Sequence, residues 1–107
     1  MRKLRLVSSN PAPMTGLERE IAQEQAESLG LAGKRLQESI DQHALSVERN
    51  ESEARQSKLL GDVSNRAWAL MVQRELVGFK HEALRWVVEN FDIPDAALSQ
   101  LGKRNED

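Results

Sequence analysis

Residues 15–48 read TGLEREIAQEQAESLGLAGKRLQESIDQHALSVE, and this stretch decides the fold. It opens with a capping box, in which the Thr15 hydroxyl accepts a hydrogen bond from the Glu18 N–H and the Glu18 carboxylate reaches back to the Thr15 N–H. Small and apolar residues then recur at alternating steps of four and three, which is typical of a helix that packs along a neighbouring helix. This seam consists of Ala22, Ala26, Leu29, Gly33, Leu36, Ile40, His43 and Val47. The pattern predicts one helix to about residue 48, roughly 50 Å long at ~1.5 Å per residue.

Gly30 and Gly33 lie inside this predicted helix. Each destabilises a helix interior by about 1 kcal/mol relative to alanine, so the helix could break after Leu29. Alternatively, together with Ala26 and Ala32 they form a patch of small residues that lets another helix approach closely. We favour the patch, because the spacing of the seam continues on both sides of the two glycines.

Residues 46–58 contain almost no large apolar side chain. Asn50 has the properties of a helix N-cap, with Glu53 at the third position after it. We therefore place a turn at residues 47–52. A continuous helix remains the alternative, since neither glycine nor proline occurs there.

The second half of the chain predicts one long helix and two short ones. The long helix covers about residues 52–77, and Gly78 follows it at the position that favours a left-handed backbone, with Phe79 folding back on the last turn. A third helix, over about 80–91, is expected to bury Leu84, Val87, Val88 and Phe91. Pro94 suits the first position of a short fourth helix that closes at Gly102. The predicted fold is all-α: a helical hairpin of two long helices plus one or two short C-terminal helices, arranged as a dimeric bundle.

The two ends of the chain differ from its middle. Residues 1–14 carry three basic residues and two prolines, Pro11 and Pro13, which exclude a helix there. We expect a flexible lead-in over 1–14, a single helical domain over 15–102 and a charged tail over 103–107. The 107-residue length fits one domain.

Composition indicates a cytoplasmic protein. The chain has no cysteine, no apolar run that could span a bilayer and no apolar stretch behind its basic N-terminus. The net charge is −2, and the part expected to fold is mildly acidic. This balance argues against a broad nucleic-acid surface.

The large apolar residues are distributed unevenly, which predicts a homodimer. Of the 26 Leu, Ile, Val, Met, Phe and Trp residues between positions 15 and 101, 18 fall in 59–101 and only eight in 15–50. A long helix with so thin an apolar stripe packs against one neighbour, and a second copy of the chain is the neighbour that we expect. The predicted interface residues are Leu29, Gly30, Gly33, Leu36, Ile40 and Arg74.

Arg74 continues the apolar face of the second helix, so its guanidinium is expected against the core or an interface. A buried arginine needs a partner. Glu20, Glu24 or Glu27 on an antiparallel first helix would supply one, in an ion pair that fixes the alignment of the helices.

No motif for catalysis, metal binding or cofactor binding is present. His43 and His81 are the only histidines, and no Glu-x-x-His occurs, so neither a zinc nor a di-iron site is indicated. The stretch from Gly30 to Lys34 lacks the spacing and the Ser or Thr of a phosphate-binding loop. We therefore expect no catalytic residue, no metal, no cofactor and no enzyme activity.

The alternative function is nucleic-acid binding. Residues 82–101 have the outline of a helix-turn-helix, but the second helix carries no basic residue with which to read DNA. Trp68 and Trp86 fit core or interface anchors better than platforms for stacking bases.

Three motifs together resemble a group of short bacterial helical proteins classed as a domain of unknown function. They are the run from Leu29 to Leu36, the sequence Val72-Gln73-Arg74-Glu75 with Gly78, and Phe91-Asp92-Ile93-Pro94 leading to Leu101-Gly102. The resemblance covers roughly residues 15–102. It implies an all-helical fold and supplies no catalytic residue. The sequence thus predicts a protein-interaction or homo-oligomerisation module, with a second copy or another protein as partner.

Overall fold

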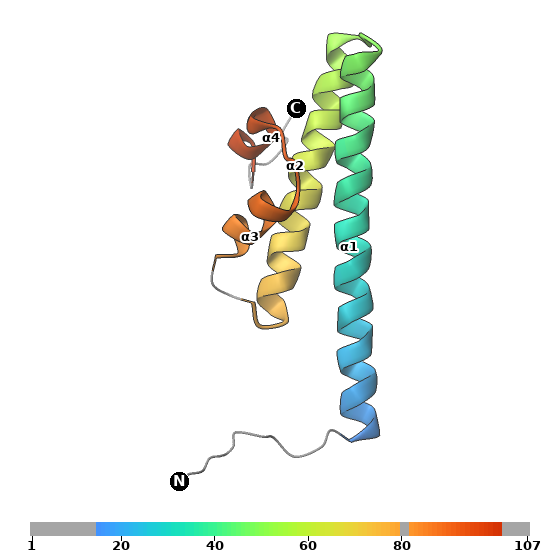
Figure 1. Cartoon of the computed structure of the whole chain (residues 1–107), viewed down its shortest axis with the longest axis vertical. Helices are drawn as coiled ribbons and strands as arrows, with labels where there is room; N and C mark the ends of the chain where they lie inside the picture. Colours follow the sequence, from blue (N-terminus) through green and yellow to red (C-terminus); the bar gives the residue numbers. More distant parts are fainter. Residues whose placement is uncertain (1–14, 80–81, 102–107) are drawn as a thin grey trace.

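The computed structural model describes residues 15–79 and 82–101, which form a helical hairpin with two short helices on one side (Figure 1). The helices are α1 (Gly16–Glu48), α2 (Glu53–Leu76), α3 (Ala83–Asn90) and α4 (Asp95–Ser99), and these described ranges hold no strand. α1 and α2 run antiparallel, and α3 and α4 pack on α2. The predicted all-α hairpin is confirmed. The expected lead-in over 1–14 and tail over 103–107 lie outside the described residues.

α1 begins at the predicted capping box. The Thr15 N–H donates to Glu18 Oε1 at 2.9 Å, and the Glu18 N–H donates to Thr15 Oγ1 at 3.1 Å. The helix then continues without a break through both glycines. Gly33 lies under the Phe91 ring, where an added Cβ would be 3.5 Å from Cζ, whereas Gly30 faces open space. The alternative of a break after Leu29 is therefore wrong.

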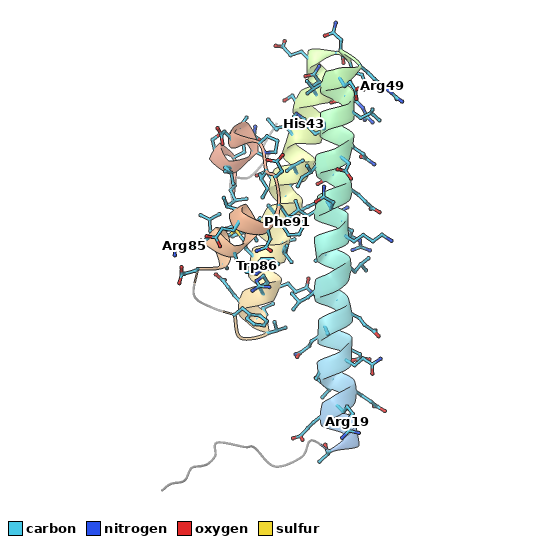
Figure 2. The ribbon with its side chains drawn as sticks, in the orientation of Figure 1. Arg19, His43, Arg49, Arg85, Trp86 and Phe91 are labelled. Atoms are coloured by element: carbon cyan, nitrogen blue, oxygen red, sulfur yellow. The ribbon has the colours of Figure 1, made fainter. Side chains whose placement is uncertain are left out.

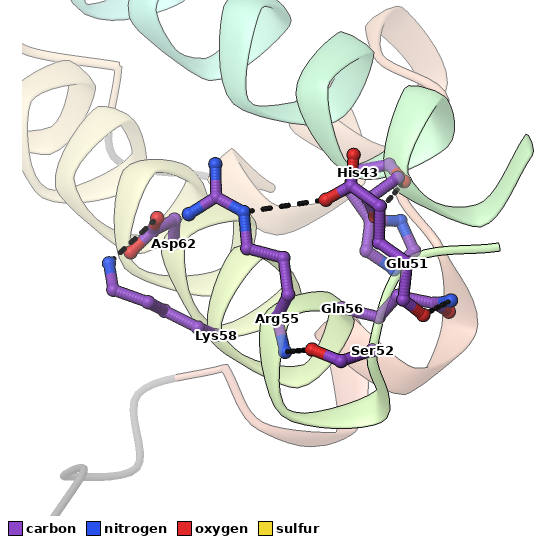
Figure 3. A network of polar contacts seen from close by, with 8 residues as sticks. His43, Glu51, Ser52, Arg55, Gln56, Lys58 and Asp62 are labelled. Carbon is purple, nitrogen blue, oxygen red and sulfur yellow. Dashed lines mark hydrogen bonds and ion pairs between the residues drawn. The ribbon is translucent and has the colours of Figure 1, made fainter. Parts of the chain in front are cut away.

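The turn between α1 and α2 lies where we expected it, but its capping residue differs. Ser52 is the N-cap of α2, and its hydroxyl accepts from the Arg55 N–H at 3.1 Å (Figure 3). Asn50 instead has a φ of 54° and closes α1. Its N–H donates to the Val47 carbonyl, as in the Schellman motif, which requires a left-handed residue that asparagine tolerates.

α2 ends as predicted. Gly78 has a φ of 110°, its N–H donates to the Glu75 carbonyl at 3.1 Å, and the Phe79 N–H donates to the Arg74 carbonyl at 2.8 Å. α3 starts at Ala83, later than the expected residue 80, after Glu82 in a left-handed conformation at φ 60°. Pro94 is the N-cap of α4, one place before its expected position. Gly102 and residues 80–81 lie outside the described part.

The core lies between the hairpin and the two short helices. Its buried residues are Leu36 and Ile40 of α1, Val63, Ala67 and Leu70 of α2, and Val87, Ile93 and Ala97. In α3 the side buried against α2 is the one that carries Ala83 and Val87. Leu84 and Val88 are 45% and 43% exposed, so the expectation that α3 buries them is wrong. One side of α3 is therefore covered by α2, and the adjacent side, which carries Leu84 and Val88, faces outward.

Candidate interaction surface

The N-terminal end of α1 extends past the end of α2. Near the end of α2, the Gln73 side-chain amide donates to the Ser28 hydroxyl, and every residue of 16–28 is exposed. We call residues 16–28 the α1 overhang. It exists because α1 has 33 residues and α2 only 24, so the antiparallel partner ends first (Figure 1).

The α1 overhang carries apolar side chains without cover from any described residue. Leu17 is 67% exposed and Ile21 is 46% exposed. Its charged side chains are Glu18, Arg19, Glu20, Glu24 and Glu27, a net charge of −3. The overhang is thus an acidic helix with exposed apolar residues.

The predicted interface residues belong mainly to the hairpin itself. Leu36 is 0% exposed and Ile40 is 7% exposed, and Leu29 packs half-buried against the same core. Leu36 and Ile40 have no surface left for a second copy, so the assignment of these two residues to a dimer interface is corrected, whereas Leu29 keeps part of its surface. α2 of the same chain occupies the place that we expected a second copy to take. Gly33 packs against Phe91, whereas Gly30 faces open space.

Arg74 stacks on aromatic rings. Its guanidinium carbon lies 3.6 Å from the centre of the Trp86 ring and 4.5 Å from that of Phe79. At such distances cation–π attraction contributes about 0.5–2 kcal/mol. Figure 2 shows Trp86 and Phe91 between α3 and the hairpin, with Arg85 pointing outward.

The expected ion pair of Arg74 with Glu20, Glu24 or Glu27 does not form within the chain. The ion pairs that join described residues are Glu51–Arg55, Lys58–Asp62 and Glu82–Arg85. Arg74 turns toward α3, whereas the three glutamates are on the α1 overhang. The Arg74 Nε is buried without an acceptor, although an unsatisfied buried donor costs about 1–3 kcal/mol.

An open cavity of about 380 Å³ surrounds this arginine. Its lining is Arg74, Gly78, Phe79, Glu82, Arg85, Trp86 and Glu89, and we call it the arginine pocket. Within this lining, the Phe79 side chain is apolar and 51% exposed. The pocket therefore offers a planar cation next to apolar surface.

A second cavity, of about 340 Å³, lies between α1 and α2. It is lined by Arg35, Glu38, Ser39, Gln42, Asp62, Asn65, Arg66 and Ala69. Its two arginines and two acids balance, and the Ser39 hydroxyl already donates to the Leu36 carbonyl at 2.7 Å. Across residues 15–79 and 82–101, no three metal-binding side chains converge. The donors and acceptors of this cavity can both bind water, and its balanced charges favour neither an anionic nor a cationic ligand.

The helix-turn-helix interpretation of residues 82–101 gains no support from the geometry. α4 has five residues, and its Ala97 is buried against the core. So short a helix, with one side covered and no basic residue, does not match a recognition helix that enters the major groove.

The aromatic partners of Arg74 were not predicted from the sequence. Trp86 and Phe79 are twelve and five positions from it, and no periodicity joins residues across two helices and a loop. The α1 overhang could be predicted from helix lengths alone, since the predicted first helix is longer than the second.

Among the described residues, none of the helices has the length and apolarity to cross a bilayer. The sequence matches a protein-family model over residues 3–106, whose description is "Family of unknown function (DUF6665)". No curated protein and no protein of solved structure matches the chain.

Proposed function

The chain belongs to this family of unknown function, and from that premise we propose that it is a homodimeric protein-interaction module without catalytic activity. We place it in the bacterial cytoplasm, in keeping with the absence of cysteine. The observation that carries the proposal is the α1 overhang, whose apolar side chains Leu17 and Ile21 are uncovered by described residues.

Helix energetics support this proposal. An isolated helix shorter than about 12–15 residues is marginal in water, and most helical stability in proteins comes from packing. The α1 overhang continues the packed part of α1, and apart from the hydrogen bond between Ser28 and Gln73 its residues are left exposed by the described chain. A partner that covers Leu17 and Ile21 would supply the missing contacts.

The lining of the two cavities supports a role without catalysis. Arg85 and Glu82 pair with each other at 2.7 Å in the first cavity, and the acids and bases of the second balance. Nucleophilic catalysis needs a hydroxyl that donates to a base, whereas the Ser39 hydroxyl of the second lining donates to the Leu36 carbonyl.

The test is the absolute mass in solution by light scattering over a tenfold dilution series. We expect the wild-type chain at twice its 12.1 kDa and the Leu17→Ser, Ile21→Ser double variant at the monomer mass. Leu45→Ser is the matched control, since Leu45 is 40% exposed on the same helix but far from the overhang. A wild-type monomer at every concentration would overturn the homodimer.

A further inference from the structure

The guanidinium of Arg74 has no hydrogen-bond acceptor among the described residues. The rings of Trp86 and Phe79 interact with the guanidinium, but a ring face accepts no strong hydrogen bond. Guanidinium donors lie in one plane and match the two oxygens of a carboxylate. Nε is buried without an acceptor, so a carboxylate from another molecule would pair with the two Nη groups, and the nearby Glu82 is paired with Arg85. Of the two carboxylates in the lining of the arginine pocket, Glu82 and Glu89, neither forms an ion pair with Arg74.

The α1 overhang carries a carboxylate on the same helix face as exposed apolar side chains. Leu17, Ile21 and Glu24 follow the spacing i, i+4, i+7, so they share one face of the helix, with Glu20 beside them. All four are exposed. This face combines an apolar ridge with an acid, which complements the arginine pocket, where Arg74 lies beside the exposed Phe79 ring.

We propose that the arginine pocket of one copy binds the α1 overhang of a second copy, with Arg74 pairing to Glu24 across the interface. This inference rests on the proposed homodimer and assigns its contact surface. The ion pair expected from the sequence is then formed between chains, because within one chain Arg74 turns toward α3 and the overhang continues past the end of α2.

Two-fold symmetry lets both copies make this contact at once. The α1 overhang and the end of α2 lie at the same end of the hairpin (Figure 1), and the arginine pocket is lined by residues from that end of α2 and from α3. A two-fold axis beside that end would bring each overhang to the other pocket, which gives a closed dimer. A standard interface buries about 800 Å² per partner. The symmetric arrangement doubles the area that one overhang and one pocket bury.

Charge favours this arrangement over direct pairing of the two overhangs. Two overhangs side by side would place four glutamates of one copy next to four of the other. Like charges across an interface are unfavourable and select against such pairing. Docking on the pocket instead brings the acidic face to Arg74 and Arg85, with Glu89 at the same lining.

The test uses two charge reversals, Arg74→Glu and Glu24→Arg, in the full chain. We expect each variant alone to raise the dimer dissociation constant at least about tenfold, because both contacts of its dimer become repulsive. In an equimolar mixture, the heterodimer pairs Glu at position 74 with Arg at position 24, and Arg74 with Glu24. Native mass spectrometry with one copy mass-labelled should show this heterodimer in excess over both homodimers.

The matched control is Arg49→Glu, an exposed charge reversal at the other end of the hairpin. Circular dichroism verifies that every variant keeps its helix content, and Arg74→Gln replaces Arg74→Glu if the latter does not fold. A wild-type monomer overturns the homodimer and this inference together. A wild-type dimer that both reversals leave unchanged, or that they weaken without recovery in the mixture, leaves the homodimer standing and overturns the Arg74–Glu24 contact.

Discussion

The Arg74 guanidinium carbon lies 3.6 Å from the centre of the Trp86 ring, and this contact ties α3 to the last turn of α2. Trp86 also meets Phe91 edge to face, with ring centres 6.1 Å apart. One indole thus joins a cation of α2 to the residue that closes α3.

Replacing Trp86 should therefore destabilise the fold much more than replacing the other tryptophan. We expect Trp86→Ala to lower the free energy of unfolding by about 2–4 kcal/mol, through lost burial and lost ring contacts. Trp68, which is 47% exposed, is the control, and Trp68→Ala should cost under about 1 kcal/mol. Urea unfolding followed by circular dichroism measures both. Equal losses would contradict the role of the stack.

Replacing glycine by alanine should have opposite effects on stability at Gly30 and at Gly78. Gly30→Ala should stabilise the protein by about 1 kcal/mol, because an added Cβ meets nothing within 4 Å and alanine favours the helix. Gly78→Ala should destabilise it by about 1 kcal/mol, since the φ of 110° is strained for any residue with a Cβ. Thermal unfolding of the two variants checks the signs. A stabilising Gly78→Ala would show that the left-handed turn is not required.

Glu82 adopts a left-handed conformation that glycine takes more easily. We expect Glu82→Gly to stabilise the fold by a few tenths to about 1 kcal/mol, because relief of the backbone outweighs the loss of an exposed ion pair with Arg85. Glu75→Gly, inside α2, is the control and should destabilise by about 1 kcal/mol. Chemical denaturation compares them, and a loss of stability in both would show that the ion pair dominates.

Removal of the N-cap should destabilise the whole protein at Ser52 but only the first turns of α1 at Thr15. Ser52→Ala removes the cap of a packed helix and should lower the global free energy of unfolding by about 1 kcal/mol. Thr15→Ala removes the cap of the α1 overhang, which can fray without opening the core. Hydrogen exchange should therefore show faster exchange confined to the first turns of α1. Faster exchange near Leu36 in the Thr15 variant would contradict this separation.

Local signals in the sequence predicted the helix ends correctly where one residue type fits best. Thr15 with Glu18 and Gly78 after α2 are such cases, because each motif is closed within a few residues. At the hairpin turn, both Asn50 and Ser52 are good N-caps, so composition alone does not separate them. Asparagine's tolerance of a left-handed backbone decided the outcome.

Contacts between distant segments were not predictable in the same way. The side of α3 that is buried depends on how Glu82 turns the chain into the helix, which exposes Leu84 and Val88. The partner of Arg74 depends on where α2 ends relative to α1. Neither relationship repeats at a regular spacing, so periodicity could not reveal it.

The continuity of α1 has a consequence for how stability depends on concentration. The same uninterrupted helix carries Leu17 and Ile21 at its free end and Leu36 and Ile40 in the core. A second copy that covers Leu17 and Ile21 binds the folded chain and not the unfolded one. By mass action, its binding free energy therefore adds to the stability of the whole hairpin. The midpoint of thermal unfolding is then expected to climb as the protein becomes more concentrated.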